Sequence, residues 1–307
     1  MRSAIRTATG DIDPASIGLC LPHEHIYTDL RPLAGRVEAE VPLADVLAAN
    51  VPLLIEARQA GVGLIVECTP PGIGRQPEVY RRVSETSGVA VVVSTGLYKE
   101  PLLPPIAYEW DEARLADWMA TEIESGIEGT SVRAGVIKLA SSDSALQPVE
   151  AKTLRAAVLA ARRTGAAIIS HSPNGRVALD QLRVLAAAGG DPARFVVVHA
   201  SSEPDLALNL EAARQGAWIE YDNIGATPDD PMIDRIRRVL DAGFGRQLLL
   251  SQDVCGWIVD RPANTRRFAY LVTDFAPKLA AAGVPDDSVA TLLAANPLRM
   301  LTLAPGD

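Results

Sequence analysis

The sequence predicts an α/β fold, a (β/α)8 TIM barrel that begins with a short N-terminal hairpin. Short apolar segments alternate with longer amphipathic segments throughout the 307 residues. Eight apolar segments are present, and eight is the number of strands in this barrel. Each segment is a continuous apolar run, as expected of strands that are covered on both faces. A doubly wound open sheet is the alternative arrangement of such units.

The expected elements follow one another without a linker, so we expect one domain that spans residues 1–307. The expected strands are residues 17–21, 63–68, 89–94, 134–139, 166–170, 195–198, 217–221 and 247–251. Apolar spacings of three and four predict helices at residues 43–60, 112–125, 149–164, 177–188, 204–215 and 231–242. Two further helices are expected near residues 265–282 and 286–295. Residues 2–9 and 11–15 meet at Gly10-Asp11, which predicts the hairpin over the barrel floor.

Composition narrows the class of protein. A hydrophobic content of 48% with 22% charged residues is typical of a globular protein with a large core. The net charge of −9 argues against a nucleic-acid or anionic-membrane surface, because both require clustered lysine and arginine. Three cysteines without CxxC spacing are expected to be reduced thiols. With no apparent signal peptide or membrane span, we expect a cytoplasmic protein that acts on a small molecule.

All four histidines lie where a metal-binding barrel would place them. His23 and His25 form an HxH pair at the C-terminal end of the first expected strand, and alternation along a strand points both side chains the same way, toward the mouth. His171 and His199 close the fifth and sixth apolar runs. The pair alone fits two loop histidines equally well, and a lone buried histidine is more often a core residue than a ligand. An open sheet would leave the HxH pair without partners from later strands.

Two charged residues complete the candidate site. Lys138 is one of only four lysines and interrupts an apolar strand, where a buried ammonium is costly. Carbamylation by carbon dioxide would turn it into a carboxylate able to bridge two metal ions; the alternative is a lysine that reaches out to the surface. Asp253 follows the eighth strand, where it would face the histidines or cap a helix.

These six residues predict a centre of two divalent metal ions. His23, His25 and Asp253 would hold one ion, and His171 and His199 the other, with carbamylated Lys138 and a hydroxide as bridges. Nitrogen and oxygen ligands without sulfur suit zinc first, and also manganese, cobalt or Fe(II). Cys255 lies near Asp253, but we do not expect it to be a ligand.

With these residues placed, the chain resembles the phosphotriesterase family, in its phosphotriesterase-like lactonase group, within the amidohydrolase superfamily. The resemblance covers nearly the whole length. The segments that carry it, besides those ending in His171 and His199, are LPHEHI (21–26), GIGR (72–75), STGLY (94–98), GIEGT (126–130), RAGVIK (133–138), SQD (251–253) and NPLRML (296–301). It implies a binuclear metallohydrolase barrel with an N6-carboxylated Lys138 and a homodimeric assembly.

The resemblance also shows where this chain departs from its relatives. Many family triesterases carry a proton relay of Asp and His at places held here by Ser202 and Asn223, and Glu203 could substitute. Tyr98 matches an aromatic position over the metals, and Trp257 is expected in the wall of a short lid loop. We take Tyr98, Asn223 and Trp257 as candidate substrate-binding residues. Arg261, Arg266 and Arg267 could bind an anionic group, but we expect a solvated face.

The predicted reaction is hydrolysis of a lactone or ester. A metal-bridging hydroxide would attack the carbonyl, and Asp253 would take the proton and pass it to the leaving oxygen. The alternatives are an organophosphate triesterase or an amide (N-acyl) hydrolase on the same site, the latter with a greater need for a second acid such as Glu203. A barrel that binds metal or ligand without turnover would be expected to have lost ligands, and a one-metal deaminase-type barrel would not need Lys138.

Overall fold

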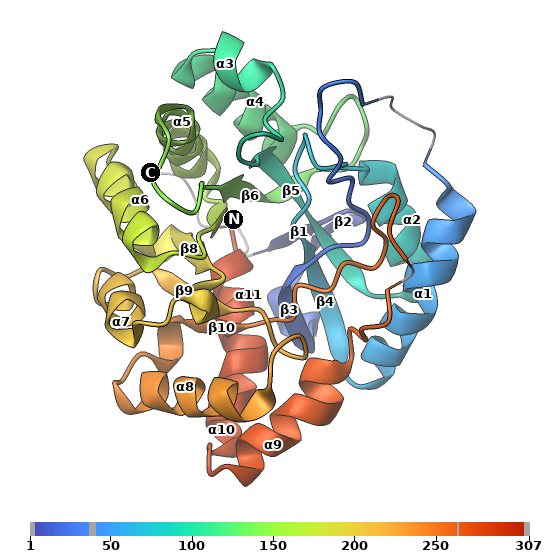
Figure 1. Ribbon diagram of the computed structural model, residues 1–307. Helices are drawn as coiled ribbons and strands as arrows, with labels where there is room; N and C mark the ends of the chain where they lie inside the picture. Colours follow the sequence, from blue (N-terminus) through green and yellow to red (C-terminus); the bar gives the residue numbers. More distant parts are fainter. Residues whose placement is uncertain (1–3, 37–40, 263, 304–307) are drawn as a thin grey trace.

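The computed structural model describes residues 4–36, 41–262 and 264–303 (Figure 1). Eight parallel strands form one sheet in chain order, from β3 to β10. Hydrogen bonds between the first strand and the residues that follow the last strand close the sheet: the His23 amide donates to Ser251 Oγ at 2.9 Å, and the Asp253 amide donates to the His23 carbonyl at 3.2 Å. The predicted (β/α)8 barrel is confirmed. Its strands are β3 (Leu19–Glu24), β4 (Val62–Glu67), β5 (Ala90–Leu97), β6 (Ala134–Ala140), β7 (Ala167–His171), β8 (Phe195–Val198), β9 (Trp218–Tyr221) and β10 (Leu248–Leu250).

The helices surround this sheet. They are α1 (Leu43–Gln59), α2 (Pro77–Ser87), α3 (Ile106–Glu109), α4 (Glu112–Glu124), α5 (Pro148–Thr164), α6 (Gly175–Ala187), α7 (Leu206–Arg214), α8 (Asp229–Asp241), α9 (Ala276–Ala281), α10 (Asp286–Ala290) and α11 (Asn296–Leu301). In the described part of the chain, none of them combines the length and apolar character that crossing a membrane requires.

The first strand begins and ends later than the sequence indicated. Ile17 follows a short 3₁₀ turn at Pro14–Ser16, so the strand starts at Leu19. It runs on to Glu24 because its far end still has main-chain partners, including the Cys68 amide, which donates to the Glu24 carbonyl at 2.9 Å. His23 therefore lies within the strand, at the carboxyl end where the sequence places the HxH pair.

The final helices also differ from expectation. The helix expected at residues 286–295 does not stop at residue 295: α10 ends at Ala290, and a wider π turn, Thr291–Ala295, leads from it into α11. Pro297 stands at the start of α11, where its missing N–H breaks the regular hydrogen-bond pattern and the π turn absorbs the irregularity. The helix expected from residue 265 begins only at Leu271, also with a π turn.

The barrel floor is closed by the predicted hairpin, with β1 (Ile5–Thr7) and β2 (Gly10–Ile12) paired antiparallel. Ile5 is fully buried within the apolar cluster inside the barrel, and the Ala8 amide donates to the Val91 carbonyl. Arg2 and Ser3 of the expected first arm lie outside the described residues.

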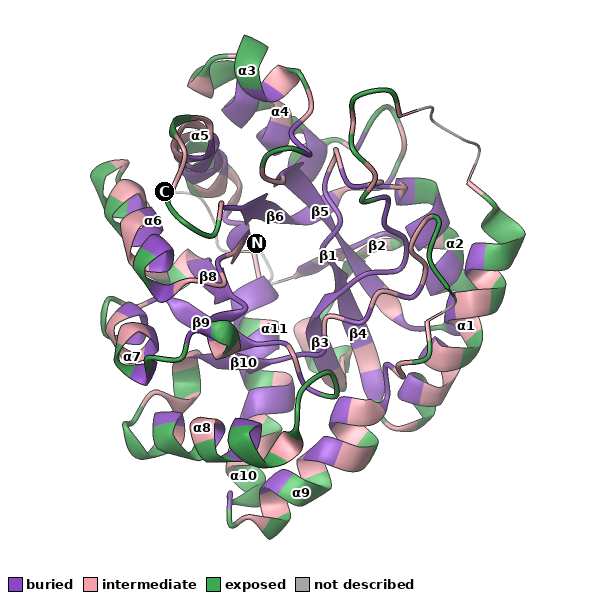
Figure 2. Cartoon of the chain, viewed as in Figure 1, coloured by how far each residue is buried: buried purple, intermediate pink, exposed green. Residues whose placement is uncertain are grey.

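Burial is concentrated at the centre of the molecule, where the strands are buried along nearly their whole length (Figure 2). A larger apolar cluster fills the space between sheet and helices, and a smaller one fills the barrel interior toward the floor. The opposite end of the interior carries charged side chains instead.

Candidate metal centre

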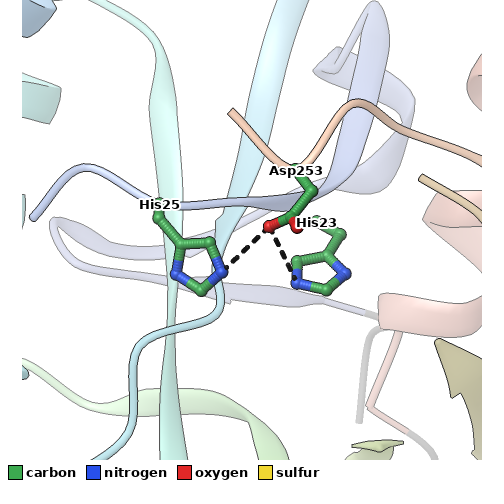
Figure 3. A group of neighbouring side chains, drawn as sticks. All are labelled: His23, His25 and Asp253. Carbon is green, nitrogen blue, oxygen red and sulfur yellow. Dashed lines mark ion pairs between the residues drawn. The ribbon is translucent and has the colours of Figure 1, made fainter. Parts of the chain in front are cut away.

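The six predicted residues meet at the carboxyl end of the barrel. His23 and His25 come from the end of β3, and Asp253 lies three residues beyond β10 (Figure 3). Asp253 Oδ1 is 3.2 Å from His25 Nε2 and 3.6 Å from His23 Nε2. On the other side, the rings of His171 and His199 lie 4.5 Å apart between their centroids. All six line a cavity of about 120 Å³, together with Thr28, Leu30, Ile73, Tyr98 and Cys255.

Lys138 lines the same cavity, beside His23. It projects from the middle of β6, and its Nζ is 3.2 Å from His23 Nε2. Only 1% of the residue is exposed, so the alternative of a lysine that reaches the surface is wrong. An ammonium held in such a place without a carboxylate partner is expensive, and conversion to a carbamate would remove that charge.

Three of the four imidazoles are oriented by a polar group on their outer side. Asp222, fully buried after β9, lies 3.1 Å from His23 Nδ1 and 2.9 Å from His199 Nδ1. His25 Nδ1 is 2.7 Å from Thr69 Oγ1. These contacts leave the Nε2 atoms of the three rings for a ligand inside the cavity. Such outer partners fix the tautomer and orientation of metal-binding histidines.

The protonation of His25, His171 and Asp253 favours cation binding, whereas that of His23 opposes it. Burial and Lys138 act to lower the pKa of His23, but Cys68, Asp222 and Glu220 together raise it well above the usual value. Burial lowers the pKa of His25 to about 4, and burial together with nearby His199 lowers the pKa of His171, so both imidazoles are neutral at pH 7. Burial opposes ionisation of Asp253, but the neighbouring His25 and His23 hold its pKa well below the usual value. Neutral imidazoles and an ionised carboxylate are the forms that bind metal.

The turn that carries Asp253 is held from two sides. Asp253 has a left-handed backbone with φ of 51°, which is uncommon for a residue with a side chain. The Glu24 carboxylate accepts hydrogen bonds from the amides of Gln252 and Val254, at 3.1 and 2.7 Å. Arg266 donates to the carbonyls of Gln252 and Asp253. The next helical segment begins only at Leu271, so Asp253 does not cap a helix.

Sequence reasoning did not single out the buried carboxylates around the cavity. Glu24, Glu67, Glu220 and Asp222 are all fully buried. Burial raises the pKa of Glu24 and of Glu67 to about 8, against the hydrogen bonds that each accepts. Each interrupts or follows an apolar strand, as Lys138 does, and that signal could have identified them.

The expected proton-relay positions form a separate group. Asn223 Nδ2 is 3.3 Å from Ser202 Oγ and 3.5 Å from Ser201 Oγ. The Glu203 carboxylate accepts from the amides of Gly175 and Asp205, so it is engaged at the start of α6. Its expected availability as a substitute acid is not supported by these contacts.

Of the three candidate substrate-binding residues, Tyr98, Asn223 and Trp257, only the first lies where we expect it, at the mouth of the cavity. Tyr98 lines the cavity, with its hydroxyl 3.5 Å from His171 Nδ1. Asn223 and Trp257 are not among the described residues that line it, and Trp257 packs against the large apolar cluster.

The expectation of a solvated arginine face is wrong for one of its three members. Arg261 is exposed, and Arg267 forms ion pairs with Glu56 and Asp274. Arg266 is instead partly buried and committed to main-chain carbonyls, including that of Ile224 at 3.1 Å. Periodicity could not reveal this, because its partners come from two distant loops.

The donor set therefore fits divalent metal. The atoms of His23, His25 and Asp253 that could bind one ion lie within 4.8 Å of one another, and His23, His199 and Asp222 form a second group with the same spacing. Together with the barrel, this site defines the class: a (β/α)8 barrel with histidine and carboxylate groups suited to metal at the carboxyl ends of its strands.

Comparison with known proteins identifies the family. A sequence model of the Phosphotriesterase family matches residues 3–301. A phosphotriesterase homology protein of Mycobacterium tuberculosis is 30% identical, over 96% of this chain and 97% of its own length. An aryldialkylphosphatase of Saccharolobus solfataricus is 27% identical, over 95% of this chain and 97% of its own length. The structure of a PTE-like lactonase mutant from Deinococcus radiodurans superimposes with a TM-score of 0.88 at 32% identity. The superposition covers 97% of this chain and 99% of that structure.

The chain belongs to the phosphotriesterase family. It is accordingly a metal-dependent hydrolase that acts on ester bonds of small molecules.

Proposed function

We propose that this protein is a binuclear metal-dependent lactonase. The observation that carries the proposal is the convergence of four histidines, Lys138 and Asp253 on one cavity at the carboxyl end of the barrel. His23, His25 and Asp253 would hold one ion, and His171 and His199 the other. Lys138, carried as its N6-carboxy form, would bridge them. Zinc suits this set of nitrogen and oxygen donors, with manganese, cobalt and iron as alternatives.

Two ions at this place would supply Lewis acidity and make a bound water more acidic. The protein's own groups would do the rest. Asp253 is ionised, lines the cavity and points toward His23 and His25 (Figure 3), so it can accept the proton of the attacking water and return it to the leaving oxygen. Tyr98 would contact the substrate from the mouth, and Ile73 and Leu30 would exclude water from the cavity wall.

The surroundings of Asp253 favour a lactone over an amide. Ring opening leaves the alcohol attached to the product, so one residue that takes and returns a proton is sufficient. An amide needs its nitrogen protonated, and the second acid that could serve, Glu203, is bound to main-chain amides. Ser202 and Asn223 at the relay positions are not acids. An organophosphate triesterase is the second candidate, supported by the aryldialkylphosphatase relative. We also propose a homodimer, the assembly expected of this family.

The proposal is tested by hydrolysis with protein loaded with zinc, manganese or cobalt. A pH-indicator panel would contain γ- and δ-lactones, a phosphotriester and an N-acyl amino acid, with Asp253→Asn as the control. Turnover of a lactone that is lost in the control supports the proposal. Turnover only of the phosphotriester or the amide would replace it with the corresponding alternative.

A further inference from the structure

One cation at the mouth of the cavity has no role in the proposed chemistry. Lys99 follows Tyr98, just beyond the end of β5. Its Nζ is 2.6 Å from Asp143 Oδ1 and 3.0 Å from His171 Nε2. Because His171 lines the cavity, these contacts place an ammonium at the cavity edge, with 18% of its side chain exposed.

Stability does not account for this placement. Asp143, the ionic partner of Lys99, has 69% of its side chain exposed, and an ion pair with so exposed a partner contributes only about 0–1 kcal/mol to folding. The two contacts also leave one of the three ammonium donors free to bind something else. The position of the Lys99 ammonium at the edge of the cavity is therefore better explained by binding of a substrate group than by a contribution to folding.

The other cations near the mouth are already engaged. Arg266 donates to main-chain carbonyls, and both Arg31 and Arg36 contact Asp29. Lys138 is buried in the cavity wall, next to His23. Within the described residues, Lys99 is therefore the cation best placed to meet a substrate group that extends out of the cavity.

We propose that Lys99 is an anion subsite that selects lactones bearing a carboxylate substituent. A single ammonium matches one carboxylate, whereas a phosphate dianion would call for a second cation. Its 3.0 Å distance from His171 requires the carboxylate to stand only a few bonds from the scissile carbonyl. Asp143 is the anion that such a substrate displaces from Lys99. This inference rests on the proposed lactonase function and names its substrate class.

The test compares two γ-lactones that differ only in a carboxylate or a carboxamide on the ring carbon next to the ring oxygen. The readout is the ratio of kcat/KM for the carboxylate lactone to that for the carboxamide lactone. Lys99→Met should lower this ratio about tenfold, as expected for loss of a charge-assisted hydrogen bond. Asp143→Asn should raise it, because the competing carboxylate is gone. A lysine that only holds its loop in place would give changes of the same sign in both variants.

Lys278→Met is the matched control. Lys278 also lies 2.6 Å from an aspartate, Asp229, but on the outer helices α9 and α8. Its replacement should leave the ratio unchanged. A ratio that stays the same in Lys99→Met, or falls in Asp143→Asn, would overturn the subsite.

Measuring the affinity for the two lactones tests the subsite separately from the proposed lactonase activity. Calorimetric titration with the two lactones, with Asp253→Asn as the background, measures affinity without turnover. Tighter binding of the carboxylate lactone that is lost on adding Lys99→Met supports the subsite. It does so even if the wild-type protein opens neither ring, because absence of turnover refutes only the lactonase function. Equal affinity for both lactones would refute the subsite.

Discussion

The two sides of the cavity are supported very differently. On the β3 and β10 side, His23 and His25 each have a buried polar partner, and the Asp253 turn is held by Glu24 and Arg266. On the other side, His199 shares the buried Asp222 with His23, but His171 contacts Tyr98 and Lys99, which belong to the mouth. The difference suggests that the first side fixes the chemistry, while the second can vary with the substrate. Each prediction below tests this division.

The largest expected effect is that of Lys138→Ala. Loss of the group that would bridge both sides should remove bound metal and abolish turnover. Metal content by elemental analysis is the measurement, and a short carboxylic acid should partly restore both metal and activity. A variant that keeps two ions per chain would contradict the bridging role.

Asp253→Asn should separate chemistry from metal binding. The amide oxygen can still contact an ion, but it cannot accept a proton, so we expect kcat to fall by about 10²–10⁴-fold while most metal remains. Steady-state kinetics on the metal-loaded variant provide the check. Full activity would exclude Asp253 as the base.

Arg266→Met tests the support of the first side. The three carbonyls of Ile224, Gln252 and Asp253 lose their charged donor, so the free energy of unfolding should fall by about 2 kcal/mol. A misdirected Asp253 should also lower kcat more than it raises KM. Denaturant unfolding and kinetics measure these two effects.

Arg267→Met is the matched control for that experiment, because Arg267 forms only half-exposed ion pairs with Glu56 and Asp274. Its unfolding free energy should change by less than about 1 kcal/mol. If both variants behaved alike, the contacts of Arg266 with the Asp253 turn would have no special importance.

The smallest effect is expected from Tyr98→Phe. The hydroxyl is 3.5 Å from His171 Nδ1, at the limit of a hydrogen bond, and the ring itself is retained. We expect kcat/KM to fall by less than about tenfold, with the change mainly in KM. A loss comparable to that of Asp253→Asn would mean that the mouth takes part in the chemistry.

Sequence alone was sufficient for the barrel and for the six residues of the candidate centre. Strand and helix periodicity are local properties, and a charged residue inside an apolar strand, such as Lys138, is visible without a structure. Parallel strands in a barrel all end at one face, so residues at strand ends could be expected to meet there.

Only the tertiary structure decided what surrounds those residues. Glu24 and the amide of Val254 are 230 positions apart, and Lys99 and His171 are 72 apart. Such contacts depend on how closure of the barrel brings separate loops together, which no local pattern encodes. The same reason explains why Arg266 could be mistaken for a solvated residue and Glu203 for a free acid. Periodicity determines which face of an element is buried, but the partner that a long polar side chain finds is decided by three-dimensional packing.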